Sequence, residues 1–479
     1  MTLNNINVEE TVQQVANLLA TEQGLSPALK GSLEMLLLLV SLLLNRLGLN
    51  SSNSSKPPST DPFRKKQPRP ASDRKPGGQP GHVGVTLQQV ADPDIVREIA
   101  VDRSLLPSGQ YRVVGHERRQ VIDLDITTVV TEWRAEILVD AQGKRYVAPF
   151  PEGVSRPVQY GIGVKVQAVY MSQYQMVPYN RIAEHFLEQM HMPVSAGTVV
   201  NFNQDAFARL AFFELWVKQA LAGEPVVHVD ETGINVGGSR CWLHNTSSKG
   251  LSYFYAHTKR GGEALDAIGI LPGFHGVLCH DHWKPYFQYG RNHALCNAHH
   301  LRELERAWEQ DGQQWAQRMN AFLKEANQAV HDAGGCLDAA TAAQYRSRYR
   351  ELLKAAEDEC PAPEPHQGAG KRGRVARSKA RNLLERLQRF EDDVLRFMED
   401  PRVPFSNNKA ENDLRMIKVQ QKVSGCFRSM DGAQIFCRIR SYVSTCRKQG
   451  LTASEALRLL FQGKWPAFMT ASPVTEGAE

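Results

Sequence analysis

The most informative stretch of the sequence is Pro225-Val-Val-His-Val-Asp230, a short apolar run that ends in a carboxylate. A second stretch of the same kind, Gly276-Val-Leu-Cys-His-Asp281, places its carboxylate 51 residues later. Short apolar runs bounded by turn residues are typical of buried strands. A buried carboxylate needs a counter-charge, so Asp230 and Asp281 indicate either a shared divalent cation or two separate turn caps. We expect a strand-rich core over residues 225–300.

A third carboxylate, Glu411, stands near the start of an expected helix, in Pro404-Phe-Ser-Asn-Asn-Lys-Ala-Glu411. One interpretation is a capping box, in which Asn408 caps the helix and Glu411 reaches back to it. The other rests on helical spacing, because three basic residues follow on the face of Glu411. They are Arg415, Lys418 and Lys422. An acid at the head of a basic stripe suits a metal site beside a phosphate backbone, so both interpretations stay open.

Helices are predicted on both sides of this core. Downstream they cover about 301–332, 337–359 and 375–399, with a final set from 407. Upstream, Tyr179–Met190 is amphipathic, and His191-Met-Pro-Val194 breaks it before Ser195, which can cap a second helix running to about Ala220. Two helices joined by a short turn fit a helix-turn-helix, although ordinary helical hairpins share the pattern. DNA contact by this pair stays open.

The first third of the chain has three kinds of sequence. Residues 8–48 repeat leucine at three- and four-residue steps, which predicts a helix that packs on its own chain or forms an oligomerising zipper. Residues 51–82 are rich in Ser, Pro, Gly and basic residues. This composition is typical of a solvated tether or of a segment that contacts the phosphate backbone of DNA. Residues 95–147 alternate in the manner of strands and predict a small β-rich module.

The composition narrows the class of protein. The 479 residues suggest roughly three domains, and 57 Lys plus Arg against 51 Asp plus Glu give a net charge of only +6. The 8 Cys all lie at Cys241 or later, which favours a reducing, cytoplasmic location over a disulfide scaffold. Met1–Glu10 has no secretory pattern. The apolar run Leu36–Leu44 is far shorter than the about 20 residues of a membrane span, so no membrane segment is expected.

Four motifs together resemble those of a known family. They are His228-Val-Asp-Glu-Thr-Gly233, Cys279-His-Asp-His-Trp-Lys-Pro-Tyr286, Cys296-Asn-Ala-His299 with Arg302, and Asn408-Lys-Ala-Glu-Asn412 followed by Arg415. In this order, over roughly residues 30–465, the chain resembles the insertion-sequence-66 transposases, a branch of the DDE transposases. Asn53-Ser-Ser-Lys-Pro-Pro58 is similar to the linker of that family.

The resemblance implies a multidomain α+β chain with a ribonuclease-H-like α/β catalytic core and a helical insertion. It implies that Asp230, Asp281 and Glu411 are both the catalytic residues and the ligands of Mg²⁺, with Mn²⁺ as an alternative. The implied activity is 3′-end cleavage of transposon DNA and strand transfer into target DNA. Implied partners are transposon-end DNA, target DNA, further copies of the chain on DNA and accessory proteins of the same element, in the bacterial nucleoid.

The predicted boundaries follow the same order. They are a leucine-rich N-terminal helical segment 1–50, a basic linker 51–82, a small β-rich module 83–155, a helix-turn-helix-like segment 156–221, a catalytic domain 222–465 with an insertion at about 301–400, and a tail 466–479. The family commonly carries a Cys-based zinc module after the linker. Residues 100–147 contain no Cys, so we expect a metal-free β unit there.

A second metal interpretation concerns two Cys-x₂-His pairs, Cys279/His282 and Cys296/His299, which are separated by 13 residues. The spacing suits tetrahedral zinc. Both cysteines fall in expected core strands, where small buried thiols are common, so structural zinc is not expected. His282 and His299 are then expected near the acidic site.

Basic residues outside the Glu411 helix also cluster. Lys371, Arg372 and Arg374 head a run with no acid, and the family resemblance favours contact with DNA phosphates there, alongside Arg415, Lys418 and Lys422; a solvated loop is the alternative. Two rival functions are a non-catalytic, zinc-stabilised DNA-binding protein and a ribonuclease-H-like nuclease with another substrate.

Overall fold

The structure is a computed structural model that describes residues 2–3, 6–22, 24–47, 49–50, 53–54, 87–363 and 377–470. Most of the predicted linker at 51–82, the basic residues Lys371, Arg372 and Arg374, and most of the predicted tail lie outside the described residues. The chain forms two units, residues 65–133 and the remainder, and each is described by itself.

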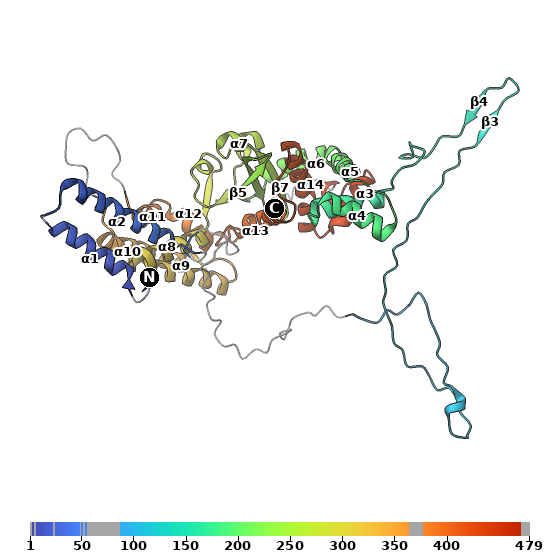
Figure 1. Ribbon diagram of the computed structural model, residues 1–479, viewed down its shortest axis with the longest axis horizontal. Coiled ribbons are helices and arrows are strands. Elements are labelled where there is room, and N and C mark those ends of the chain that lie inside the picture. Colours follow the sequence, from blue (N-terminus) through green and yellow to red (C-terminus); the bar gives the residue numbers. More distant parts are fainter. Residues whose placement is uncertain are drawn as a thin grey trace. The chain divides into compact units, whose positions relative to one another are not determined.

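A five-stranded mixed sheet forms the centre of the larger unit (Figure 1). Its strands are β5 (Val226–Val236), β6 (Ser239–Ser247), β7 (Ser252–His257), β8 (Val277–His280) and β9 (Asn292–Leu295). The order across the sheet is β7-β6-β5-β8-β9. The first three strands form an antiparallel meander, and β8 and β9 run parallel to β5. These strands confirm the predicted strand-rich core and the mixed α+β class.

The β5–β6 hairpin shows why the meander forms. Val236 pairs with Ser239, so the loop contains only Gly237 and Gly238, whose φ angles are +56° and +83°. A two-residue hairpin of this type needs positive φ at both loop positions, and glycine adopts it without steric cost. The turn lengthens β5 well beyond the prediction. Asp230 was expected at the end of its strand, but it lies in the middle of β5, paired with Asn245.

Three buried clusters hold helices against the sheet. On one face, Ile234, Leu243 and Phe254 pack with Leu414 of α13 (Asn408–Val423) and Phe436 of α14 (Met430–Lys448). A second cluster joins the sheet to the helices that precede it, with α15 (Ala453–Phe461). Those helices are α3 (Ile162–Val169), the π-helical turn Tyr170–Tyr174, α4 (Tyr179–Met190), α5 (Ala196–Arg209) and α6 (Ala211–Ala222).

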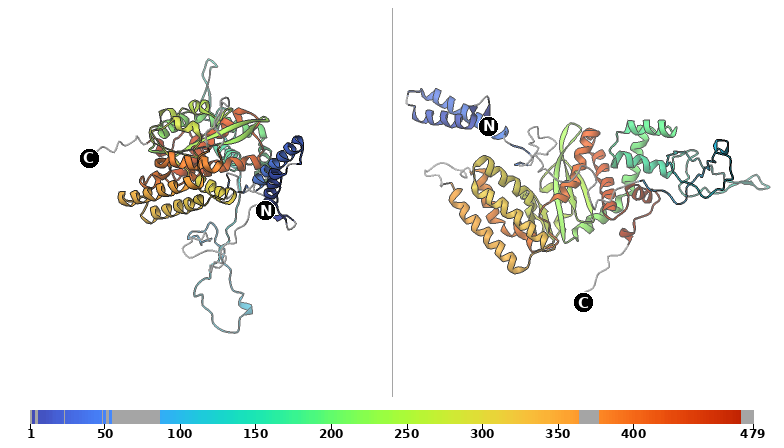
Figure 2. Two further views of the ribbon diagram at one scale, coloured as in Figure 1. Left: turned by 90° about the vertical axis from the view of Figure 1, so that its left-hand side faces the viewer. Right: turned by 90° about the horizontal axis from the view of Figure 1, so that it is seen from below.

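The third cluster belongs to the helical insertion, which packs against β8 and β9. The insertion consists of α8 (Asn297–Asp311), α9 (Gln314–Asp332), α10 (Ala339–Glu359), α11 (Lys379–Arg389) and α12 (Glu391–Leu395), followed by a 3-10 turn at Arg396–Met398. Figure 2 shows these helices as a yellow-to-orange bundle beside the sheet. Shorter elements are α7 (Gly262–Ile268), α16 (Ala467–Thr470) and 3-10 turns at Leu271–Gly273 and Lys284–Gln288.

Two of the predicted helices are present, but each is interrupted once along its length. The second helix of the predicted pair is capped by Ser195, whose hydroxyl accepts from the Thr198 N–H, but it is interrupted at Leu210. The helix predicted over 375–399 breaks at Phe390. The ring of Phe390 packs 4.9 Å from that of Phe287, and this contact favours a bend over a straight helix.

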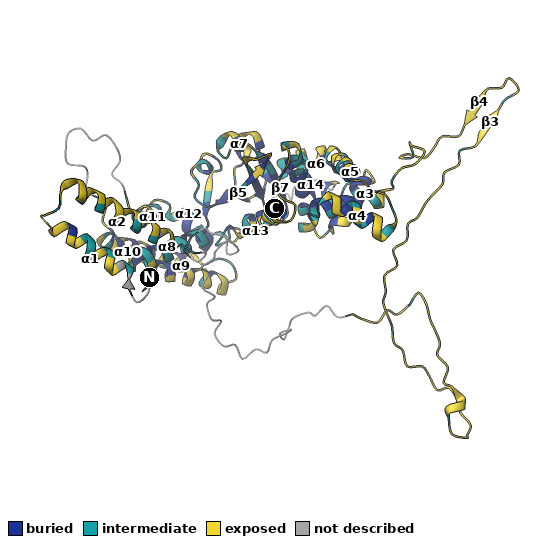
Figure 3. Cartoon of the chain, in the orientation of Figure 1, coloured by how far each residue is buried: buried dark blue, intermediate teal, exposed yellow. Residues whose placement is uncertain are grey.

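The N-terminal helix predicted over 8–48 is two helices, α1 (Val8–Thr21) and α2 (Pro27–Leu47). Proline at the first helical position and Ser26, which accepts from the Leu29 N–H, explain the new start. Its leucines are largely exposed, including Leu36, Leu39 and Leu43, and Figure 3 shows α2 mostly in yellow. Although no membrane segment was expected, one helix among the described residues, Pro27–Leu44, is long and apolar enough to cross a membrane by length and composition.

The predicted β-rich module is mostly wrong. Within described residues 87–155 the strands are β3 (Ile137–Val139) and β4 (Arg145–Val147), which pair with each other across a short turn. The other regular element there is a 3-10 turn at Arg103–Leu105. Val121 is 93% exposed and Val129 85% exposed, so the alternating pattern has no apolar surface against which a sheet would be stable.

Candidate active site

Asp230 and Asp281 reach the same edge of the sheet from adjacent parallel strands. The β5–β8 ladder covers Val226–His228 and Val277–Cys279, so each carboxylate follows the ladder within two residues. The Asp230 carboxylate accepts from the Glu231 N–H at 2.9 Å, and Asp281 accepts from the Trp283 N–H at 3.0 Å. The structure therefore brings the two predicted residues together, although Asp230 does so from within a strand.

Glu411 is carried to the same place by α13, which packs against β5 and β6. The capping-box interpretation is wrong, because the helix is capped by Asn407 and not by Asn408, and the cap residue makes no side-chain hydrogen bond to the first turn. The side chain of Asn407 has other partners. Its Oδ1 lies 2.8 Å from Nδ1 of His228, and its Nδ2 donates to the Val229 carbonyl at 2.8 Å. Asn407 thus ties the start of the Glu411 helix to the strand of Asp230.

The pKa values of Asp230 and Glu411 are both raised. Burial raises the pKa of Asp230 well above its usual range, and the charges of Glu231, Asp281 and Glu411 add to the rise. Burial also raises the pKa of Glu411, with the charge of Asp281 adding to it and the Arg302 guanidinium opposing it. Like charges gathered in a poorly solvated place are stabilised by a bound cation, and carboxylate oxygens suit Mg²⁺ or Mn²⁺. The donor set therefore fits the predicted metal.

Glu231 is a neighbour that sequence reasoning missed. Its buried carboxylate accepts two bonds from Arg260, at 2.8 and 2.5 Å, and one from the Tyr286 hydroxyl at 2.5 Å. The Arg260 guanidinium lies between the indoles of Trp242 and Trp283, 4.8 and 4.6 Å from the ring centres. Glu231 is thus paired within a cluster of side chains next to Asp230. No local pattern marks Arg260, which lies 29 residues along the chain.

The four Cys and His residues do not gather as one set. Among the described residues, the cluster with ligand spacing consists of Cys296, His299 and Glu411. His282 instead packs edge-on against Phe390, with ring centres 4.7 Å apart. Burial lowers the pKa of His299 to about 4 and raises that of the Cys279 thiol to about 12. His299 does lie beside the acidic site, as predicted, with Nδ1 3.7 Å from the Glu411 carboxylate.

The basic stripe of α13 is exposed but not uniform. Arg415, Lys418 and Lys422 all lie on the surface. The Lys418 ammonium donates to the Gly233 carbonyl of β5 at 3.1 Å, and burial lowers its pKa. Lys418 therefore anchors the helix to the sheet, and phosphate contact by the stripe stays a prediction.

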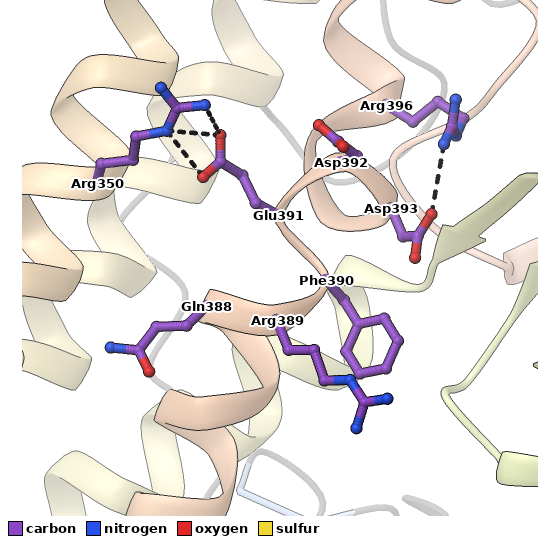
Figure 4. A pocket seen from close by; sticks show the side chains of 8 residues that line it. All are labelled: Arg350, Gln388, Arg389, Phe390, Glu391, Asp392, Asp393 and Arg396. Atoms are coloured by element: carbon purple, nitrogen blue, oxygen red, sulfur yellow. Dashed lines mark hydrogen bonds and ion pairs between the residues drawn. The ribbon is translucent and has the colours of Figure 1, made fainter.

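A hollow in the insertion is not part of this site. Figure 4 shows its lining around the α11–α12 bend, and none of the three carboxylates belongs to it. Its charged groups pair with one another, as Glu391 does with Arg350 and Asp393 with Arg396.

Comparison with known proteins identifies the family. Residues 158–435, more than half of the chain, match the model described as Transposase IS66 family, and the match includes all three carboxylates. The chain belongs to this family, which confirms the resemblance. Residues 2–88 match a model described only as a family of unknown function. The uncharacterized protein y4jO of Sinorhizobium fredii is 39% identical over 70 residues, 15% of this chain and 22% of that protein.

The raised pKa of Asp230 predicts a stability effect. A carboxyl group whose folded pKa lies above the unfolded value destabilises the fold at neutral pH, and the cost disappears as pH falls to the unfolded pKa, about 4. Asp230→Asn should therefore raise the melting temperature at pH 7 in the absence of divalent ions. For a domain of this size, each kcal/mol gained in the free energy of unfolding corresponds to about 2–4 °C. The gain should shrink at pH 5.

Thermal melts in a chelating buffer measure this difference. The exposed Asp125→Asn serves as the matched control and should change nothing. A lower melting temperature for Asp230→Asn at pH 7 would show that Asp230 has a favourable partner and carries no repulsive charge.

Proposed function

We propose that the protein is a DNA transposase that cleaves the 3′ ends of its element and joins them to target DNA. The observation that carries the proposal is the convergence of Asp230, Asp281 and Glu411, from β5, the end of β8 and α13, at one edge of the sheet. Membership of the family supports it. The sheet, an antiparallel meander extended by two parallel strands, supports a ribonuclease-H-like core.

The proposed chemistry is two in-line displacements at phosphorus. Water first replaces the 3′ oxygen at the transposon end, and the freed 3′-hydroxyl then replaces a 3′ oxygen in the target strand. Asp230, Asp281 and Glu411 would hold Mg²⁺ or Mn²⁺, which would supply charge stabilisation for the entering and leaving oxygens. Asn407 and the Glu231–Arg260 cluster fix the backbone from which these carboxylates project. No covalent enzyme intermediate is required.

We further propose that the α4–α5 pair and the basic residues of α13 hold DNA, that the chain acts as a homo-oligomer on DNA in the nucleoid, and that accessory proteins of the same element take part. The rival is a zinc-stabilised DNA-binding protein without catalysis. The separation of His282 from the Cys296–His299 cluster gives that rival no four-ligand site among the described residues.

The decisive experiment incubates the full chain with a duplex of the element's end and either Mg²⁺ or Ca²⁺, and scores 3′-end nicks. Nicks with Mg²⁺ and binding without nicks in Ca²⁺ are expected, because Ca²⁺ takes more ligands at longer and looser distances. Tight end binding, stoichiometric zinc and no Mg²⁺-dependent nick would favour the rival.

The basic stripe gives a separate prediction on affinity. Each lost phosphate contact flattens the slope of log affinity against log salt by about 0.9 on duplex DNA. Lys422→Ala should weaken end binding and flatten the slope by that amount, with no change in melting temperature. Lys418→Ala should weaken binding too, but its bond to Gly233 adds a structural cost.

Binding measured at several salt concentrations checks both variants. The exposed Lys354→Ala in α10 is the matched control. Equal slopes for Lys422→Ala, Lys418→Ala and the control would leave the stripe as ordinary solvated surface.

A further inference from the structure

Three ligand-type atoms of different chemistry meet beside the acidic site. Cys296 stands at the N-terminus of α8, His299 lies one turn further along that helix, and Glu411 lies in the first turn of α13. The Glu411 Oε1 is 4.0 Å from the Cys296 sulfur and 3.7 Å from Nδ1 of His299. One sulfur, one nitrogen and one oxygen atom all lie within 4.8 Å of one another.

This spacing is close to that of a tetrahedral ion. Zinc bonds of about 2.0–2.3 Å at tetrahedral angles place neighbouring ligand atoms roughly 3.3–3.8 Å apart. Two of the three separations are already near this range, so small side-chain rotations complete the set. Thiolate, neutral imidazole and carboxylate together carry two negative charges, which match a divalent ion.

The surroundings favour a soft ligand set. The Cys296 sulfur accepts the Asn407 N–H at 3.1 Å. Burial raises the pKa of this thiol to about 11, and the Asn407 N–H opposes the rise, so the thiol gives up its proton when it binds an ion. The Nδ1 atom of His299 is buried and has no hydrogen-bond partner, so its lone pair is not engaged by the protein. Sulfur and imidazole ligands select zinc-class transition ions over Mg²⁺.

We propose that Cys296, His299 and Glu411 bind a transition-metal ion of the zinc class, and that this ion inhibits the enzyme. The inhibitory half rests on the proposed function, because it requires Glu411 to serve the acidic site. Glu411 belongs to both ligand sets. When the softer ion holds Glu411 against Cys296 and His299, where it already lies, the pair Asp230 and Asp281 loses its third carboxylate.

Cobalt absorption tests the site without any DNA. Titrating the full chain with Co²⁺ should give a thiolate-to-cobalt charge-transfer band that saturates at one ion per chain. Cys296→Ser should lose the band, and His299→Gln should weaken Co²⁺ binding. Cys279→Ser is the matched control, since Cys279 is also a buried thiol of this region but lies outside the cluster, and it should keep the band.

Two results would overturn the site. One is a band that persists unchanged in both Cys296→Ser and His299→Gln. The other is a band lost equally in Cys279→Ser, which would place the ion on the Cys279/His282/Cys296/His299 set. Circular dichroism confirms that each variant is folded, and His299→Gln decides the matter if Cys296→Ser is not.

Zinc titration of the nicking reaction tests the inhibition. Wild-type nicking in Mg²⁺ should fall at least tenfold as zinc reaches one equivalent. Cys296→Ser, compared with its own zinc-free rate, should need at least about tenfold more zinc, because even an outer partner of a metal site changes affinity about 10–100-fold. Equal zinc sensitivity in the two proteins would overturn the inhibitory role.

Different results would overturn the proposed metal site and the proposed transposase function. Asp230→Asn should lose nicking yet keep the cobalt band, since Asp230 is not one of the three ligands. A wild-type chain that binds cobalt as described but never nicks DNA would overturn the proposed function and the inhibition while supporting the site.

Discussion

Replacing any one of the three carboxylates with its amide should lower DNA cleavage by about a thousandfold or more, a loss expected when a group that stabilises transition-state charge is removed. Asp230→Asn, Asp281→Asn and Glu411→Gln keep the size of the side chain and remove the charge that would hold the cations. Strand transfer should fall with cleavage, because both displacements use the same site.

End binding separates this loss from misfolding. Gel-shift affinity for the element's end should stay within a few fold in all three variants, because none of the carboxylates is expected to contact phosphates directly. The surface variant Glu351→Gln in α10 should cleave normally. Substantial Mg²⁺-dependent cleavage in one amide variant would remove that residue from the site.

The sequence was sufficient to predict that Asp230 and Asp281 lie on or just after buried strands, because the signals for these strands are local. Apolar runs that end in Asp230 and Asp281 indicate buried strands, and parallel strands place such residues at one edge. The length of β5 was not predictable in this way. Its second half is stabilised by β6 across the two-glycine turn, and pairing with another segment leaves little trace in the strand itself.

The position of Glu411 needed the structure for a different reason. A capping box and a metal ligand predict the same spacing, and the metal role of Glu411 stays a prediction. The capping box is excluded because the helix is capped by Asn407, whose side chain has distant partners. One partner, His228, lies 179 residues away in the chain. The β-rich module predicted over residues 95–147 shows the opposite case, since most of it forms no strand. Alternation there is real, but the large exposed fractions of Val121 and Val129 show that a pattern alone does not supply a packing partner.

Arg260→Ala should destabilise the protein by about 2–4 kcal/mol, because it leaves the carboxylate of Glu231 buried without its counter-ion. The Glu231 side chain is only 2% exposed, whereas that of Arg260 is 41% exposed, so water offsets part of the full cost of a broken buried pair. The variant also removes the cation that lies between Trp242 and Trp283.

The loss should depend on pH. Burial already raises the pKa of Glu231, and Arg260 opposes the rise. Without Arg260 the folded pKa moves further above the unfolded value, so the folded state of the variant takes up a proton more readily. Its free energy of unfolding should therefore fall as pH rises through that folded pKa. We expect a larger deficit relative to wild type at pH 8 than at pH 5.

Urea unfolding of the wild type and three variants distinguishes the loss of the ion pair from the loss of stacking on tryptophan. The variants are Arg260→Ala, Arg240→Ala and the double variant Arg260→Ala/Glu231→Gln. Arg240→Ala is the matched control, since Arg240 also lies over Trp242, at 4.9 Å, but is exposed and makes no bond to Glu231. It should cost less than about 1 kcal/mol, as expected for an exposed cation over a ring. Combining Arg260→Ala with Glu231→Gln removes the unpaired charge and should recover part of the loss. If Arg260→Ala and Arg240→Ala cost the same, stacking on Trp242 would be the main contribution of both arginines. The Glu231 pair beside Asp230 would then be no more than a marginal support for the acidic site.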